Sequence, residues 1–257
     1  MKVDSVTVAA ALAFAASAAV TVAWCGAMAD MPGMDMPGGW QMSMAWMRMA
    51  GQGWLACAVT FLGMWGVMMI AMMMPVLAPM LARHRRAMKE SGGVDRPGLS
   101  ACVVAGYFFI WMLAGLALFP PGALLADWAM REPAVSRAMP ISGALIVLAA
   151  GALQFTRWKS RRLAGCRHTL DCCRDLEPHA RAAWRHGLEL GLRCVYCCAS
   201  LTAVLIVIGV MDLLAMALVT MAISAERLSP ERLRADFVVG AALLAGGAWM
   251  MCKAVAP

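Results

Sequence analysis

Sulfur-bearing side chains are the residues of this sequence whose types and spacing could do chemistry. The 257 residues include 25 Met and 10 Cys, and many of them lie in three clusters. A thioether is a soft, uncharged ligand that suits Cu(I), and a thiolate is a soft anionic ligand for the same ion. Three such clusters in one chain point to the binding of a soft metal ion.

The first cluster is a methionine-rich stretch within residues 28–53, where Pro, Gly and Trp alternate with Met. This composition is unsuited to a core helix and predicts an outer loop. A thioether needs no deprotonation and cannot be lost to disulfide formation outside the cell. An interfacial loop that contacts lipid or a partner protein is the alternative. The residues expected to capture Cu(I) are Met31, Met34 and Met36, aided by Met42 and Met44.

The second cluster lies in an apolar helix that contains two prolines. Met64, Met68 and Met72 recur every four residues and share one face, and Met69 and Met73 form the adjacent stripe. Pro75 and Pro79 predict a kink that frees backbone oxygens beside these sulfurs. Ordinary packing of Met between helices is the alternative. The predicted intramembrane metal station consists of Met68, Met72 and Met73, with Met211 and Met216 from a later helix.

The third cluster is Cys194, Cys197 and Cys198, whose i, i+3 and i+4 spacing puts them on one helix face. We expect them at a cytoplasmic helix end, where thiols stay reduced and Arg193 favours the thiolate that binds metal. They form the predicted inner Cu(I) acceptor. Zinc is a weaker possibility, because a single Cys-x-x-Cys pair is not specific. A redox pair, Cys197 with Cys198 or Cys172 with Cys173, is the other alternative.

Four further cysteines occur singly in apolar stretches. We interpret Cys25, Cys57, Cys102 and Cys252 as small core residues.

The elements that must position these sulfurs are membrane-spanning helices. Hydrophobic residues make up 62% of the chain and charged residues only 14%, against about 25% in a soluble domain, and the mean hydropathy is +0.72. These values exclude a soluble enzyme and a disordered chain. The net charge of +7, from 22 basic and 15 acidic residues, is typical of basic cytoplasmic loops facing anionic lipid and does not indicate nucleic-acid binding.

Apolar stretches of about 20 residues predict an all-α, polytopic membrane helix bundle that forms a single domain, residues 1–257. The apolar run 194–225 is too long for one span, and Gly209 and Asp212 divide it. About seven spans result, with an inner basic loop, 157–187, between the fourth and fifth. They cover residues 6–27, 54–81, 99–125, 135–155, 188–209, 211–226 and 237–255.

The basic residues predict the orientation. With the N-terminus in the cytoplasm, 18 of the 22 Lys and Arg fall on the cytoplasmic side, which the positive-inside rule favours. The expected location is the bacterial inner membrane, with multiple passes. The first span is expected to stay uncleaved, and a cleaved signal peptide is the alternative.

Four stretches together resemble the bacterial DUF2182 family of predicted metal-binding integral membrane proteins. They are Trp65–Pro75, Ala150–Lys159, Cys194–Cys198 and Gly209–Glu226. The resemblance extends from about residue 39 to residue 227 and implies metal binding, without a settled reaction or direction of transport. The chain differs from the common family pattern at Leu153, Ala199 and Arg227.

Met outside, Met through a kinked helix and Cys inside form a graded set of soft ligands. This order predicts a non-enzymatic membrane protein that binds Cu(I) and moves it or hands it over, since thiolates hold Cu(I) more strongly than thioethers. No Walker-type motif for an ATP motor is present. Expected partners are the metal ion, the lipid bilayer and a copper chaperone or metalloprotein. The alternatives are a membrane thiol-redox enzyme or sensor, and an assembly subunit for a secreted metalloprotein.

Overall fold

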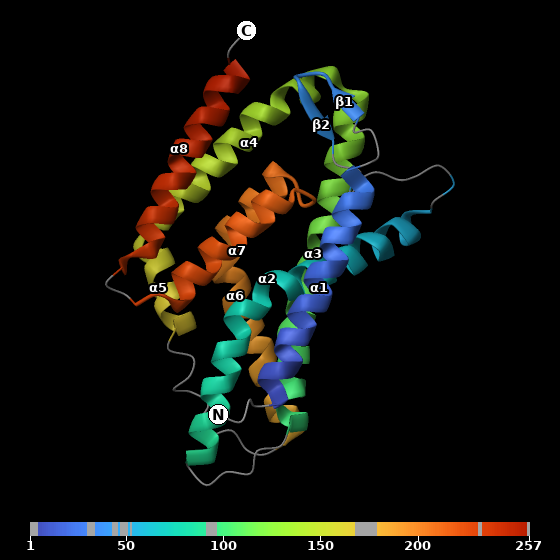
Figure 1. Ribbon diagram of the computed structural model, residues 1–257. Coiled ribbons are helices and arrows are strands. Elements are labelled where there is room, and N and C mark those ends of the chain that lie inside the picture. The colour runs from blue at the N-terminus through green and yellow to red at the C-terminus, as the bar shows by residue number, and fades with distance from the viewer. Residues whose placement is uncertain are drawn as a thin grey trace.

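The helices of the chain form one bundle with a small hairpin at one end (Figure 1). The computed structural model describes residues 5–29, 34–42, 46, 51, 53–90, 97–167, 179–230 and 233–255. The helices are α1 (Ser5–Ala29), α2 (Trp54–Glu90), α3 (Pro97–Arg131), α4 (Pro133–Gln154), α5 (Arg157–Arg167), α6 (Ala180–Ile208), α7 (Leu213–Leu228) and α8 (Ala235–Val255). The strands are β1 (Met34–Met36) and β2 (Trp40–Met42). The predicted all-α polytopic bundle is confirmed.

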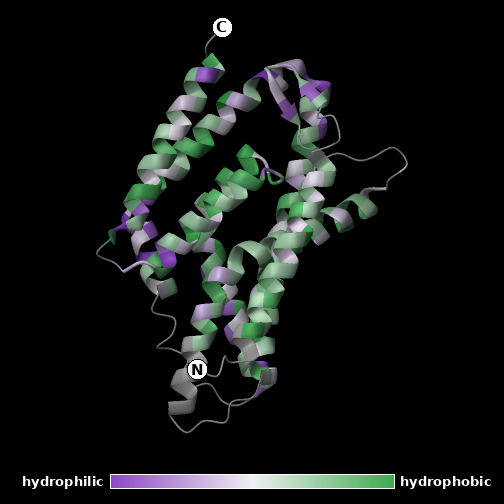
Figure 2. Cartoon of the chain, in the orientation of Figure 1, coloured by the Kyte–Doolittle hydropathy of each residue, from purple (hydrophilic) through white to green (hydrophobic). Residues whose placement is uncertain are grey.

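Six helices in the described part of the chain are long and apolar enough to cross a membrane, namely α1, α2, α3, α4, α6 and α8. Figure 2 shows apolar residues along them. The protein is therefore a multi-pass membrane protein. About seven spans were predicted, but the stretch expected to form the sixth is α7, with only 16 residues. Figure 1 places the start of α1 and the end of α8 at opposite ends of the bundle, with the short α7 running obliquely inside it.

The described parts of the predicted basic loop, 157–187, are helical rather than loop over residues 157–167 and 180–187. It contains α5 and the first turns of α6. Helix α5 is amphipathic. Its buried residues Lys159, Leu163 and Cys166 recur at i, i+4 and i+7 and share one face, whereas Arg161 lies on the exposed side. The short amphipathic helix thereby brings one lysine and one cysteine into the protein interior.

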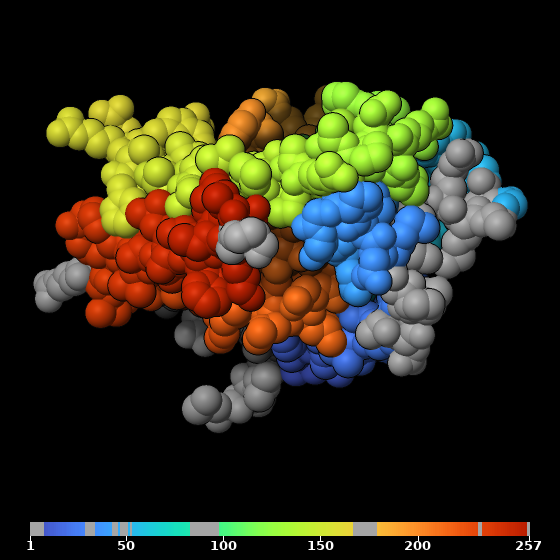
Figure 3. Space-filling model, turned by 90° about the horizontal axis from the view of Figure 1, so that it is seen from above, coloured from blue at the N-terminus to red at the C-terminus, as the bar shows by residue number. Residues whose placement is uncertain are grey.

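The predicted outer loop, 28–53, contains an antiparallel hairpin in which Met34 pairs with Met42 and Met36 pairs with Trp40. Its turn uses Gly38 and Gly39, both at positive φ. The Trp40 indole N–H donates to the carbonyl of Ser136 at 2.9 Å, which fixes the hairpin to α4. Seen from above, the hairpin lies against the light-green residues near the junction of α3 and α4 (Figure 3).

The main core lies where α2, α3, α6 and α7 meet, while α4 pairs with α8 along its length (Figure 1). Helix α2 stays continuous across Pro75 and Pro79 but changes direction along its course. Prolines remove backbone hydrogen bonds inside a helix, which accounts for the bend. The bend agrees with the predicted kink and keeps the methionine face of α2 buried over several turns.

Helices α3 and α6 approach each other closely through glycines. A Cβ atom at Gly106 would meet the carbonyl oxygen of Trp184, and one at Gly187 would meet the backbone of Val103. Small residues four apart, such as Gly187 and Gly191, allow this backbone contact between membrane helices. The close packing places Tyr107 of α3 directly against α6.

Replacing Gly187 by Ala is expected to destabilise the protein by about 1–3 kcal/mol, because the new methyl group forces α3 and α6 apart. Thermal unfolding of the detergent-purified chain measures the loss. The matched control is Gly246→Ala in α8, where a Cβ would meet nothing within 4 Å. Equal stability of the two variants would contradict the close contact.

Candidate metal centres

The three predicted cysteines lie together on the buried face of α6. Cys194, Cys197 and Cys198 are at most 2% exposed, and the Cys194 and Cys198 sulfurs lie 3.8 Å apart. A fourth thiol joins them from α5, since the Cys166 Sγ donates to the carbonyl of Arg193 at 3.4 Å. We call these four residues the thiol cluster. Cys172 and Cys173, the alternative redox pair, lie outside the described residues.

The sulfur of Cys194 accepts two hydrogen bonds from other helices. The Tyr107 hydroxyl donates to it from α3 at 3.0 Å, and the Arg227 guanidinium donates from α7 at 3.0 Å. A donor that carries positive charge suits an anionic sulfur. Three helices therefore converge on one thiol.

A buried ion pair lies beside the thiol cluster. The Lys159 ammonium is 2.8 Å from the Glu226 carboxylate, and the two side chains are 1% and 2% exposed. Lys159 also donates to the carbonyl of Cys197 at 2.8 Å, and the Gln154 amide donates to Glu226 at 2.8 Å. Burying these charges is costly unless they are paired and hydrogen-bonded, as they are here. The network ties α4, α5 and α7 to the cysteine face of α6.

Cys166 is the thiol of the cluster that α5 supplies. Its hydrogen bond with Cys197 and its burial raise the pKa of the Cys166 thiol. Cys166 is therefore protonated at neutral pH, in keeping with its role as donor to the Arg193 carbonyl.

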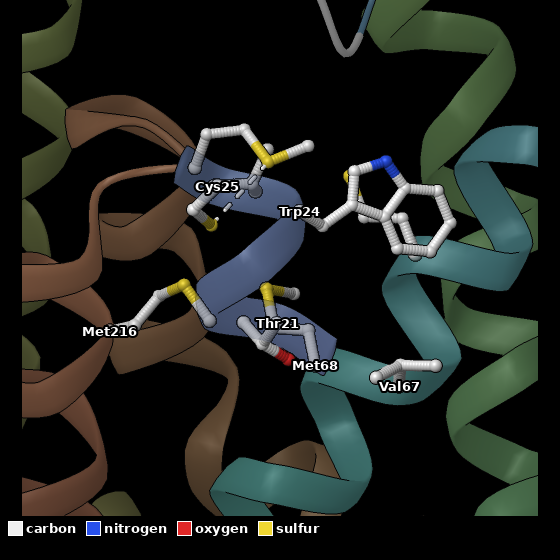
Figure 4. A pocket seen from close by; sticks show the side chains of 9 residues that line it. Thr21, Trp24, Cys25, Val67, Met68 and Met216 are labelled. Atoms are coloured by element: carbon white, nitrogen blue, oxygen red, sulfur yellow. Dashed lines mark hydrogen bonds between the residues drawn. The ribbon is translucent and has the colours of Figure 1, made fainter. Parts of the chain in front are cut away.

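A second group of sulfur residues lines a pocket between α1, α2 and α7 (Figure 4). Three residues of the predicted station, Met68, Met211 and Met216, line it, and Cys25 donates to the Met211 sulfur at 3.9 Å. Met72 and Met73 are buried in the core but do not line the pocket. The lining residues are Thr21, Trp24, Cys25, Met64, Val67, Met68, Val210, Met211 and Met216. We call this site the sulfur pocket.

The outer methionines take different positions. Met36 and Met42 are 7% and 3% exposed and pack against α3, whereas Met34 is 44% exposed. Met31 and Met44 lie outside the described residues. The hairpin thus holds part of the predicted capture sequence against the protein.

Within the described ranges, no group of three or more His, Cys, Asp or Glu side chains has the arrangement of a metal site. Cys194 already accepts hydrogen bonds from Tyr107 and Arg227, so a metal ion on its sulfur would bind beside these two donors.

The sequence model of the PpoB2 family, described as a copper chaperone, matches residues 62–250. The chain belongs to the PpoB2 family. Membership gives it a copper-related role. The match supports the predicted metal chemistry but carries a different family name from DUF2182. No curated protein and no solved structure matches the chain.

The part matched by the PpoB2 family includes the thiol cluster and the α2 and α7 methionines of the sulfur pocket, whereas α1 and the hairpin precede it. Sequence reasoning did not identify Tyr107, Lys159, Glu226 and Arg227 as site residues. Lys159 and Glu226 both lie in stretches that resemble the DUF2182 family. Charged residues next to apolar helices were the available signal, but their mutual contact depends on tertiary packing.

Proposed function

We propose that this PpoB2-family protein binds Cu(I) inside the bilayer through sulfur ligands and hands it over, without catalysing a reaction. The thiol cluster is the observation that carries the proposal, because buried thiols from two helices converge beside positively charged groups. Thiolate sulfur is a preferred ligand of Cu(I). Family membership supports copper as the cargo.

The charges around the thiol cluster favour a Cu(I) complex with two thiolates. Such a complex carries one negative charge. Lys159 and Glu226 form a neutral pair, which leaves Arg227 as the positive group in contact with Cys194. One positive group then faces one net negative charge, which lowers the cost of burying the loaded site.

The proposed route begins at the outer methionines and ends at the thiols. Met31, Met34 and Met36 capture Cu(I), the station of Met68, Met72, Met73, Met211 and Met216 holds it within the membrane, and Cys194, Cys197 and Cys198 accept it. In this proposal the protein lies in a bacterial inner membrane with its N-terminus in the cytoplasm. A copper chaperone or metalloprotein is then the partner in handover.

Replacing Cys194, Cys197 and Cys198 together by Ser is expected to remove the Cu(I) held by the thiol cluster, because a hydroxyl is a poor ligand for a soft ion. Copper per chain, measured after anaerobic loading and desalting of the purified protein, reports the loss. The control is Cys102→Ser with Cys252→Ser, which lie outside both centres. Copper absent from the wild type, or unchanged in the triple variant, would contradict the proposal.

Thiol trapping separates this function from redox cycling. The Cys194 and Cys198 sulfurs lie 3.8 Å apart, so these two thiols are also neighbours that a redox enzyme would oxidise as a pair. A copper carrier keeps these thiols reduced through loading and release, whereas a redox enzyme accumulates an oxidised form that responds to oxidant.

A further inference from the structure

The sulfur pocket is a site distinct from the thiol cluster, and α7 connects the two. Met216 lies near the start of α7, and Arg227 lies in its last turn. Their separation of eleven positions along the helix corresponds to about 16 Å. An ion in the pocket therefore uses other ligands than an ion at the thiol cluster.

Five sulfur-bearing side chains from three parts of the chain line the pocket, namely Cys25, Met64, Met68, Met211 and Met216. Figure 4 shows Cys25 with its interaction to a methionine sulfur, and Met68 and Met216 below it. Cys25 is the one thiol in this lining, and its Sγ lies 3.9 Å from the Met211 Sδ. Cys25, which the sequence indicated as a small core residue, therefore contacts Met211, a predicted metal ligand.

The break between α6 and α7 puts Met211 in this position. Gly209 has a φ of 134°, a conformation that favours glycine, and it ends α6. Asp212 then caps α7 by accepting from the Ala215 N–H at 2.8 Å. Met211 lies in the short connection between these two fixed points, outside either helix.

Thr21 supplies a second, independent sign of a ligand. It is 8% exposed, it lines the same pocket, and its hydroxyl has no hydrogen-bond partner among the residues that the structure describes. Leaving a buried hydroxyl without a hydrogen-bond partner is destabilising. Thr21 lies one helical turn before Cys25 in α1, so its hydroxyl is placed to donate to the Cys25 thiolate that a bound soft ion requires.

We propose that the sulfur pocket is a selective site for a monovalent soft metal ion, with Cys25 as its anionic ligand and Met211, Met68, Met64 and Met216 as candidate thioether ligands. This inference rests on the proposed Cu(I) function and deepens it, because it gives the proposed intramembrane station a thiolate ligand, Cys25, and a selectivity. On binding, the thiol proton is released to water and a metal–sulfur bond forms, with no change in oxidation state.

Charge is the reason for the selectivity. One thiolate and one Cu(I) ion sum to zero, and the methionines add no charge. A neutral complex is far cheaper to hold at membrane depth than a charged one. Zn(II) on the same ligands would carry one more positive charge than Cu(I), and thioethers are poor partners for it. The pocket should therefore accept Cu(I) and Ag(I) and reject Zn(II).

The experiment compares wild type with Cys25→Ala in the full-length, detergent-purified chain, titrated anaerobically with Cu(I) against a chromophoric Cu(I) chelator. We expect Cys25→Ala to bind one Cu(I) fewer per chain. The matched control is Cys57→Ala, which removes another buried thiol that does not line the pocket and should keep the wild-type number. Ag(I) titrations should repeat the pattern, and Zn(II) titrations should show no difference between the proteins.

A second variant keeps the test decisive if Cys25→Ala is poorly folded. Met211→Leu keeps the volume and apolar character of the side chain but removes the sulfur, and it should weaken the same Cu(I) equivalent. Unchanged Cu(I) binding in a folded Cys25→Ala or Met211→Leu variant, or a Zn(II) equivalent that wild type binds and Cys25→Ala loses, would overturn the inference. If the Cys194, Cys197 and Cys198 variant still loses its copper, Cu(I) binding at the thiol cluster stands without the pocket.

Discussion

Replacing Lys159 by Met is expected to lower the free energy of unfolding by about 3–5 kcal/mol, the usual cost of removing one partner of a buried ion pair. The Glu226 carboxylate, 2% exposed, then loses the ammonium 2.8 Å away. The carbonyl of Cys197 loses a hydrogen bond at the same time. Chemical unfolding of the detergent-purified chain, followed by circular dichroism, measures the change.

The double variant Lys159→Met with Glu226→Gln separates charge from packing. It leaves neither charge buried, so we expect it to be more stable than Lys159→Met alone. Arg161→Met, on the exposed side of the same helix, is the matched control and should change stability by about 0.5 kcal/mol or less. A double variant no more stable than the single one would show that the ion pair is not what stabilises this region.

The bundle and the cysteine face of α6 followed from patterns within single segments. Apolar runs of the required length predicted the long helices, and i, i+3, i+4 spacing predicted that Cys194, Cys197 and Cys198 share a face. Each of these inferences needs only the geometry of one helix. Cys166 required the further observation that the basic segment after α4 has an amphipathic period.

Contacts between segments could not be derived in this way. Lys159 and Glu226 are far apart in the sequence and meet only because α5 and α7 pack on the same part of α6. Cys25 reads as a small core residue in an alanine-rich helix, and nothing in its neighbours indicates Met211 as its partner. The hairpin was missed because Pro and Gly between methionines suit a loop and a turn equally well.

Arg227 is the positioning residue with the largest expected effect on metal binding. Replacing it by Gln is expected to lower the Cu(I) affinity of the thiol cluster about 10- to 100-fold, the range seen when a group supporting a metal ligand is removed. The guanidinium contacts Cys194 at 3.0 Å. The charge of Lys159 is neutralised by Glu226, so Arg227 carries the positive charge that balances the thiolates. Without it, a Cu(I) complex with two thiolates keeps an uncompensated negative charge.

Competition titrations with a Cu(I) chelator measure this affinity, and the conservative variant tests the role of charge. Arg227→Lys keeps the positive charge and should retain more of the affinity than Arg227→Gln, whereas a purely structural role predicts that both variants lose stability and affinity together. Tyr107→Phe removes the other hydrogen bond to Cys194 without changing charge, so a smaller loss is expected. Equal affinities for wild type and Arg227→Gln would show that the arginine charge does not support the bound ion. Equal losses for Arg227→Gln and Tyr107→Phe would attribute the effect to hydrogen bonding alone.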